Sequence, residues 1–233
     1  MLGMFDPIYF LFVGPPMLLA MWAQAKVKGN FNKWSKVAAS SRLSGAEAAQ
    51  RMLDSAGINN VKIEPVNGML SDHYDPRSRA LRLSPGVYQS NSVAAVGIAC
   101  HEAGHAMQHA QNYGPLGLRS ALVPVVQFGS MAMWPLFLGG MFLQMQSLIL
   151  VGIVAFSATV LFQIVTLPVE FDATARAKRQ LQTLGITGSQ EETKGVNAVL
   201  DAAAMTYVAA TISALAQLAY FVFRSGLLGG RND

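Results

Sequence analysis

Four long stretches of the chain are almost entirely apolar, and most of the polar residues lie between them. A transmembrane helix needs roughly 20 apolar residues to cross the hydrocarbon core of a bilayer, and each stretch reaches that length. Pro15 and Pro16 lie near the middle of the first stretch and predict a kink or a break there, because proline removes a backbone donor. The predicted transmembrane helices are residues 5–25, 121–143, 147–167 and 203–223.

Residues 26–119 have the pattern of a small α+β domain that opens with a basic linker. Ser44 and Glu47 have the spacing of a capping box and predict the start of a helix, which Gly57 closes. Residues 61–66 alternate apolar and polar side chains, and this alternation is typical of a half-buried strand. The domain therefore begins with a helix and a strand.

A hairpin and a second helix are predicted to follow. Residues 69–74 and 80–83 form the hairpin, with Asp75-Pro76 in its turn. We expect residues 80–83 to lie at a sheet edge, where the main chain can hold an extended peptide. The alternative is an ordinary edge strand that its neighbouring arginines protect. The second helix comprises residues 92–110, and Gly114-Pro115 ends it.

The composition favours a membrane protein. Hydrophobic residues make up 52% of the 233 residues and charged ones only 13%, whereas soluble domains carry about a quarter charged residues. The net charge of +4 does not indicate nucleic-acid binding, because eleven lysines and arginines lie in residues 26–119 and four in residues 168–202. Cytoplasmic segments carry such an excess, so we expect both segments in the cytoplasm. No basic residue precedes the first span, so we expect it to be an uncleaved anchor. The single cysteine, Cys100, excludes an intrachain disulfide and fits a reducing compartment.

The candidate chemistry is concentrated in the pentad His101-Glu102-Ala103-Gly104-His105 of the second predicted helix. Residues four apart lie on one face of a helix, so His101 and His105 can present two imidazole nitrogens to one zinc ion. Glu102 projects to the side, where it can act as the general base on a metal-bound water. The alternative is a buried helix that happens to contain histidines, but three of the four histidines fall within nine residues.

A catalytic zinc site needs a third protein ligand and an open position for water. The extended motif that would supply a third histidine is absent, because Gln108 and Gln111 occupy its glycine and histidine positions. A carboxylate after the third span is favoured, since the second and third spans return the chain to the same membrane face. Glu170 is our candidate, against the alternative that it caps a helix or marks the membrane boundary. Asp172 lies about 200° round the helix, so only one of the two can bind the ion.

The sequence does not assign a definite role to the other polar residues near the pentad. His109 lies one turn further along, too far up the axis to share a tetrahedral ion comfortably, and His73 lies in the predicted hairpin, where a lone histidine is more often structural. Candidates for a second donor to the oxyanion are His109, Tyr88 and Arg176. Asp172 is expected to form a surface pair with Arg176.

Further motifs accompany the pentad, namely Ser71-Asp72-His73-Tyr74-Asp75-Pro76-Arg77 and Leu167-Pro168-Val169-Glu170-Phe171. Together with residues 101–109 they resemble the YugP family of neutral zinc metallopeptidases of bacterial membranes, and the similarity covers nearly the whole chain. More distantly, the order of zinc helix, two spans and glutamate is similar to HtpX-type membrane proteases. Their ligands fall on His101, His105 and Glu170. Those relatives usually carry an aspartate four residues after the ligand glutamate, where this chain has Thr174.

We therefore expect a mainly α membrane protein with four transmembrane helices and a small α+β zincin-like cytoplasmic domain. Residues 168–202 would form a cytoplasmic helix and loop with the third zinc ligand. The expected function is a Zn²⁺-dependent endopeptidase that cleaves membrane-associated proteins or peptides at the cytoplasmic face of the bacterial inner membrane. Glu102 is its catalytic base, and membrane-protein quality control is one role that this activity would serve.

Two other classes of function compete with the peptidase. A non-catalytic zinc-containing scaffold or adaptor is the alternative, and a closed site of four protein ligands would indicate it. A transporter is disfavoured, because the last three spans contain no charged residue. The expected partners are a substrate and the lipid bilayer, without nucleic acid. Gly139-Gly140 and other small residues permit close helix packing within or between chains, so an oligomer is compatible with the sequence.

Overall fold

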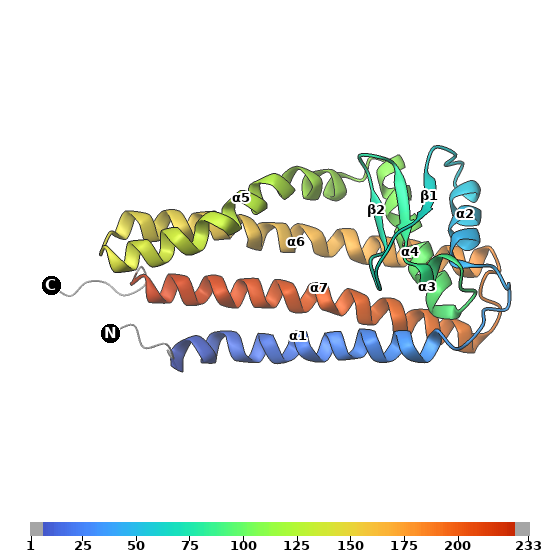
Figure 1. The fold of residues 1–233 in the computed structure, drawn as a ribbon, viewed down its shortest axis with the longest axis horizontal. Coiled ribbons are helices and arrows are strands. Elements are labelled where there is room, and N and C mark those ends of the chain that lie inside the picture. Colours follow the sequence, from blue (N-terminus) through green and yellow to red (C-terminus); the bar gives the residue numbers. More distant parts are fainter. Residues whose placement is uncertain (1–6, 227–233) are drawn as a thin grey trace. The chain divides into compact units, whose positions relative to one another are not determined.

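Long helices dominate the structure, a computed structural model that describes residues 7–226. Within these residues, four helices are long and apolar enough to be candidate membrane spans (Figure 1). They are α1 (Pro7–Trp34), α5 (Gly114–Phe142), α6 (Gln146–Thr183) and α7 (Gln190–Arg224). The prediction of four membrane-length helices is confirmed by length and composition, while residues 5 and 6 of the first predicted span lie outside the described residues.

The predicted break at Pro15 and Pro16 is wrong, and so is the predicted linker after the first span. α1 continues through Pro15 and Pro16, because a proline removes only the hydrogen bond of its own nitrogen and the apolar run continues on both sides. The basic linker is helical as far as Trp34. Tertiary contacts hold it there, since Asn30 Nδ2 donates a hydrogen bond to the carbonyl of Ala198 at 2.9 Å and the Trp34 ring packs against Gly195.

The chain divides into two compact units. The described part of the first unit comprises residues 7–22, 118–167 and 206–226. Phe221 lies in its interior, with ring centroids 4.5 Å from Phe137 and 5.3 Å from Phe156. Large apolar side chains also cover its outside, and Phe128 and Val154 are 75% and 70% exposed. This unit is therefore apolar both inside and outside.

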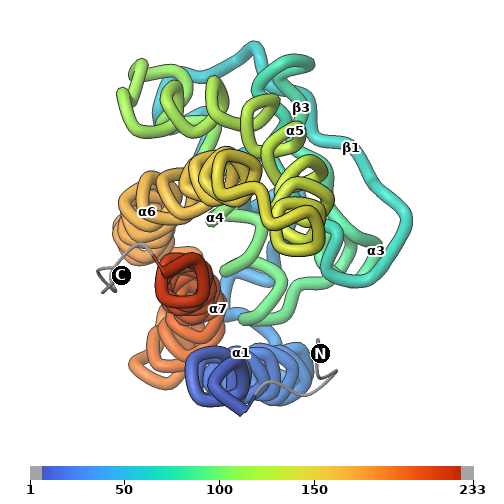
Figure 2. Tube along the Cα trace, turned by 90° about the vertical axis from the view of Figure 1, so that its left-hand side faces the viewer, coloured from blue at the N-terminus to red at the C-terminus, as the bar shows by residue number. Residues whose placement is uncertain are grey.

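α5 and α6 lie side by side near the short connection between them (Figures 1 and 2). A Cβ atom at Gly129 would lie 2.8 Å from the carbonyl oxygen of Ala155, and one at Gly140 would lie 2.7 Å from the amide nitrogen of Ile149. Only glycine permits such an approach of two backbones. The expectation of close packing at small residues is met at Gly140, whereas Gly139 faces open space.

The second unit comprises residues 23–117 and 168–205. Its smaller elements are α2 (Gly45–Ser55), β1 (Lys62–Pro65), β2 (His73–Asp75), β3 (Ala80–Leu83), α3 (Pro85–Tyr88) and α4 (Val93–Ala110). This order confirms the predicted helix, strand, hairpin and helix, with the short α3 added. The capping box is also confirmed, because the Ser44 side chain accepts from the amide of Glu47 and the Glu47 carboxylate accepts from the amide of Ser44.

The sheet order corrects the predicted position of β3. The strands are arranged β1-β3-β2, with β3 parallel to β1 and antiparallel to β2 (Figure 1). β3 is therefore the central strand, and both of its edges are paired. The prediction that residues 80–83 form an exposed peptide-binding edge is wrong, because β1 returns to the far side of the hairpin, and this long-range pairing leaves no local signal in the sequence.

One predicted boundary and one predicted stop signal are also wrong. The first hairpin strand begins at His73 instead of residue 69, because Gly68 and Leu70 have positive φ angles of 110° and 54°, which are incompatible with an extended strand. α4 ends at Ala110 as predicted, and Asn112, at a φ of 51°, lies between α4 and α5. Gly114-Pro115 begins α5 instead, since proline fits the first turn of a helix.

Candidate metal centre

α4 is a capped helix that is buried along most of its length. The Ser92 side chain accepts a hydrogen bond from the amide of Ala95 at 3.2 Å, which satisfies one of the free donors at the start of the helix. Cys100 is fully buried, and burial raises the pKa of its thiol to about 12. This thiol is therefore protonated and unreactive at neutral pH. The helix is a fixed support for the pentad.

His101 and His105 of α4 meet Glu170 of α6 in one group. One ligand atom from each residue lies within 4.8 Å of the others. The Nε2 atoms of His101 and His105 lie 3.2 Å and 3.5 Å from the same atom, Glu170 Oε2. Glu170 is only 1% exposed, and a carboxylate buried to this extent needs a positive partner. Helix α6 brings Glu170 here because it continues without a break through Pro168.

The other ring nitrogens of both histidines face hydrogen-bonding side chains. His105 Nδ1 lies 3.0 Å from Gln108 Oε1, and His101 Nδ1 lies 3.2 Å from the Thr174 hydroxyl. An amide oxygen only accepts hydrogen bonds, so His105 must carry its hydrogen on Nδ1. Its Nε2 then has a lone pair directed at the group, which is the form that binds a metal.

Gln108 links α4 to Asp172 of α6. Its Nε2 donates to the carbonyl of Val169 and to Asp172 Oδ2, both at 2.8 Å. Asp172 also accepts from Arg176 Nε at 2.5 Å, and Arg176 donates to Gln111 Oε1 at 2.6 Å. The predicted Asp172–Arg176 pair is confirmed. The contact with Gln108 was missed, although a polar side chain three residues after His105 on the same helix was a usable signal.

Gly104 allows α4 and α6 to approach each other beside the group. A Cβ atom at this position would lie 2.8 Å from the carbonyl oxygen of Ala173 and 3.2 Å from its Cα atom. Real Cβ contacts are longer, so any other residue here would push α6 away. Glu170, Ala173 and Ala177 are almost fully buried, and the close approach therefore fixes the position of Glu170 relative to the two histidines.

Glu102 lies beside the group but does not belong to it. Its Oε2 atom accepts a hydrogen bond from the backbone amide of Tyr74 on β2 at 3.1 Å. The hydroxyl of the same Tyr74 lies 2.8 Å from His109 Nδ1. One residue of β2 thus contacts both Glu102 and His109.

The other polar residues considered from the sequence differ in their contacts. His109 is paired with Tyr74 and does not belong to the group of His101, His105 and Glu170. His73 is exposed, with its Nδ1 2.8 Å from the carbonyl of Ser71. Tyr88 packs against the apolar core, and Arg176 is held by Asp172 and Gln111. Among the three oxyanion candidates, His109 alone adjoins a residue that contacts Glu102.

The electrostatic environment favours a cation at this place. Burial lowers the pKa of an imidazole, but hydrogen bonding to Glu170 and the charges of Glu102 and Glu170 outweigh it and hold the pKa of His105 above its usual value. Burial also raises the pKa of Asp72, and the charge of Glu102 adds to that rise although hydrogen bonds from Ser84 oppose it. The negative charges of Glu102 and Glu170 beside His105 therefore favour a cation in the group.

The donor set fits zinc. Two imidazole nitrogens and one carboxylate oxygen are the ligands of many catalytic zinc sites, which keep a further position open for water. Within residues 7–226, the metal-binding group consists of His101, His105 and Glu170 and has no fourth protein ligand. The arrangement of the Nδ1 partners directs both Nε2 atoms inward, as a metal requires.

The chain also matches known proteins along most of its length. Residues 9–226 match the family described as "Putative neutral zinc metallopeptidase". The chain belongs to this family. It is 52% identical over 215 residues to the "Putative membrane protease YugP" of Bacillus subtilis (strain 168), and the match covers 92% of this chain and 94% of that protein. No solved structure matches it. Family membership confirms the resemblance drawn from the motifs and, with the His-His-Glu group, supports zinc as the cofactor.

Proposed function

We propose that this member of the zinc metallopeptidase family is a membrane-embedded endopeptidase, with His101, His105 and Glu170 as its zinc ligands and Glu102 as its general base. The observation that carries the proposal is the convergence of three ligand atoms within 4.8 Å while Glu102 remains outside the group. A structural zinc site would be closed by four protein ligands. The described residues provide three and leave a carboxylate beside them, which favours catalysis over a scaffold.

The residues around the group have separable tasks in peptide hydrolysis. Bound zinc would polarise the scissile carbonyl and lower the pKa of its water towards 7. Glu102 accepts the proton of the attacking water and returns it to the leaving amine. The amide of Tyr74 holds the Glu102 carboxylate at 3.1 Å, so the base is oriented before substrate binds.

The pair of Tyr74 and His109 can donate a hydrogen bond to the developing oxyanion. Burial raises the pKa of Tyr74, so its hydroxyl keeps its proton at neutral pH. A phenol and a neutral imidazole carry two polar hydrogens, and their mutual hydrogen bond at 2.8 Å uses one of them. The other, on the Tyr74 oxygen or on His109 Nε2, remains available as a donor.

We place the four membrane-length helices in the bacterial inner membrane, with residues 26–119 and 168–202 on the cytoplasmic side. The exposed apolar side chains of the first unit and the concentration of lysine and arginine in these two segments support this topology. The substrates would be membrane-associated proteins or peptides, because Glu170 directly follows the predicted span 147–167. Membrane-protein quality control is a role that such an activity would serve.

Substitution of the base tests the reaction. Purified full-length protein in detergent, loaded with zinc, should cleave an unstructured protein substrate such as casein, whereas Glu102→Gln should retain stoichiometric zinc and lose cleavage. Both imidazoles and Glu170 remain in the variant, so only the proton acceptor is removed. Equal cleavage by the wild type and by Glu102→Gln would overturn the mechanism, and stoichiometric zinc without any cleavage by the wild type would favour the scaffold.

Labelling of introduced cysteines tests the topology. Cys100 is fully buried with a raised pKa, so the native chain should give no background with a maleimide. Met145 is 46% exposed in the connection between α5 and α6. A membrane-impermeant maleimide added to intact cells should label Met145→Cys and leave Ser41→Cys unlabelled until the membrane is opened. Labelling of Ser41→Cys from outside would refute the orientation.

A further inference from the structure

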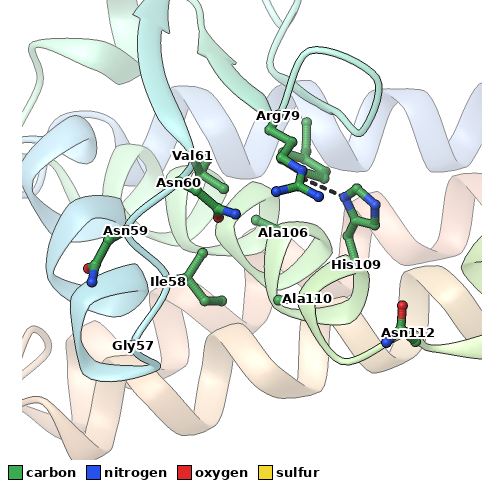
Figure 3. A pocket seen from close by; sticks show the side chains of 11 residues that line it. Gly57, Ile58, Asn59, Asn60, Val61, Arg79, Ala106, His109, Ala110 and Asn112 are labelled. Carbon is green, nitrogen blue, oxygen red and sulfur yellow. Dashed lines mark hydrogen bonds between the residues drawn. The ribbon is translucent and has the colours of Figure 1, made fainter.

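A cavity of about 620 Å³ lies along α4 beyond Glu102. The loop after α2, the hairpin of β2 and β3 and the end of α4 form its walls (Figure 3). Its lining includes Asn60, Tyr74, Arg79, Ala106 and His109. The cavity belongs entirely to the second unit, and no part of the metal-binding group lines it.

The cavity is placed where an extended peptide on Glu102 would reach it. Glu102, Ala106 and His109 follow one face of α4, because residues three and four apart are neighbours on a helix. Ala106 lies about 6 Å and His109 about 10 Å along the axis from Glu102. An extended chain advances about 3.3 Å per residue. For a peptide that runs along α4 from Glu102, a substrate residue two or three positions from the scissile bond would therefore lie over the cavity.

The polar groups of the cavity are donors without a matching acid. Its lining contains the arginine Arg79, the amides of Asn59, Asn60 and Asn112, and the Tyr74–His109 pair, but no aspartate or glutamate. Among residues 7–226, no carboxylate forms an ion pair with Arg79. Arg82 offers a contrast within the same hairpin, since Glu64 and Asp75 hold its guanidinium at 3.6 Å and 3.1 Å.

The side chain of Arg79 is directed into the cavity. In Figure 3 its guanidinium lies between Asn60 and His109, above the apolar floor that Ile58 and Ala106 form. The backbone of Arg79 has a φ of 48°, a left-handed conformation that glycine adopts without strain. The chain nevertheless has arginine at this position, and a charged side chain held there is consistent with a binding role.

We propose that this cavity binds a carboxylate of the peptide substrate through Arg79, with the asparagine amides as further donors. An acidic side chain two or three residues from the scissile bond and the C-terminal carboxylate of a short peptide share this chemistry. The inference rests on the proposed function, because it assumes that a peptide lies across Glu102. Such a cavity would make the enzyme selective for substrates that carry a carboxylate near the cleavage site.

The test compares cleavage-site preferences of zinc-loaded full-length protein in detergent. Wild-type protein is given a peptide library with free or amidated C-termini, and mass spectrometry identifies the cleaved bonds. We expect Asp or Glu to be enriched at one position within three residues of the cleaved bond. Enrichment that persists in amidated peptides assigns the site to a side chain, whereas enrichment only beside a free C-terminus assigns it to the terminal carboxylate.

Substitutions of Arg79 and Arg77 make the test specific. Arg79→Gly suits the left-handed backbone and should fold normally. It should lower the ratio of acidic to neutral peptide cleavage about tenfold, because losing a hydrogen bond between charged groups typically weakens binding by at least that factor. Arg79→Glu should reverse the preference to Lys or Arg at the same position. Arg77 is exposed in the same turn but does not line the cavity, so Arg77→Gly should leave the ratio unchanged.

The outcomes separate this inference from the proposed function. Cleavage without an acidic preference, or an acidic preference that survives in Arg79→Glu, overturns the cavity assignment and leaves the peptidase intact. Absence of cleavage by the wild type overturns the peptidase. In that case binding is measured directly, by fluorescence anisotropy of a labelled acidic peptide with the Glu102→Gln variant and with the double variant Glu102→Gln/Arg79→Glu. Loss of binding in the double variant supports the cavity assignment, and unchanged binding refutes it.

Discussion

The two sides of α4 differ in packing and in charge. On one side His101 and His105 face α6, and Gly104 brings the two helices so close that a Cβ atom would lie 2.8 Å from Ala173. On the other side Glu102, Ala106 and His109 face β2 and an open cavity. The first side is closed by residues of the chain itself, whereas the second leaves room for another molecule.

Under the proposed function, this difference separates metal binding from substrate binding on one helix. Metal ligands must be held within a few tenths of an ångström, so close helix packing and buried hydrogen bonds suit them. A substrate has to enter and leave, which needs exposed donors around an accessible space. Changes on the closed side should therefore alter zinc content and stability, and changes on the open side should alter turnover and specificity.

The largest effect is expected on the closed side, at the third ligand. Glu170→Ala should lose most of its bound zinc, because two buried imidazoles remain without the carboxylate that completes the group. Asp172→Ala should keep its zinc, since Asp172 contacts Gln108 and Arg176 instead of the histidines. Elemental analysis of both purified variants decides, and the reverse pattern would show that the ligand assignment is wrong.

Gly104→Ala should break the close packing itself. Its new methyl group must displace the backbone at Ala173, and overpacking of this kind costs about 1–3 kcal/mol, so both the unfolding temperature and the zinc affinity should fall. Gly97→Ala is the control on the same helix, because its Cβ atom would lie 3.8 Å from Val196 in ordinary contact. Alanine is favoured over glycine in helices by about 1 kcal/mol, so the control should be at least as stable as the wild type. Equal stability of the two variants would contradict the packing argument.

Gln108→Met should weaken zinc binding while leaving all three ligands in place. The variant keeps the length of the side chain but removes the acceptor of His105 Nδ1 and the donor to Asp172. Loss of a hydrogen-bond partner of a metal ligand typically lowers metal affinity about 10- to 100-fold. Zinc titration against a chelator measures it. Gln111→Met, which removes only an exposed contact with Arg176, serves as control and should retain wild-type affinity.

Tyr74→Phe is the mildest change and addresses the open side. It keeps the backbone amide that holds Glu102 but removes the hydroxyl that pairs with His109. A neutral hydrogen bond contributes about 0.5–1.5 kcal/mol, so kcat should fall by up to about tenfold with unchanged zinc content. Tyr88→Phe, in the apolar core, should leave kcat unchanged. An equal loss in both variants would exclude a specific role for the Tyr74 hydroxyl.

Much of the second unit follows from local sequence. The capping box at Ser44 and Glu47 and the cap at Ser92 formed as their side chains predict, because both interactions lie within a few residues. The pentad spacing indicated His101 and His105, and the helix phase separated Glu170 from Asp172. These are properties of single helices, whose periodicity the sequence carries directly.

Other features depend on segments that are distant in sequence. The place of β3 in the middle of the sheet depends on its parallel pairing with β1. Thr174 reaches His101, and Gln108 reaches Asp172, only when α6 lies against α4. For the same reason the predicted edge strand was wrong and the Thr174 partner of His101 stayed unassigned.

The sequence by itself determined four membrane-length apolar helices, the pentad with its two histidines and the family of the protein, because each is a pattern of neighbouring residues. Only the tertiary structure decided which atoms converge at the metal-binding group and why position 104 is glycine. It also decided that Arg79 borders a cavity without an acidic partner within the described residues. Convergence of this kind depends on the distance between backbones that a long chain separates, and no local pattern encodes that distance.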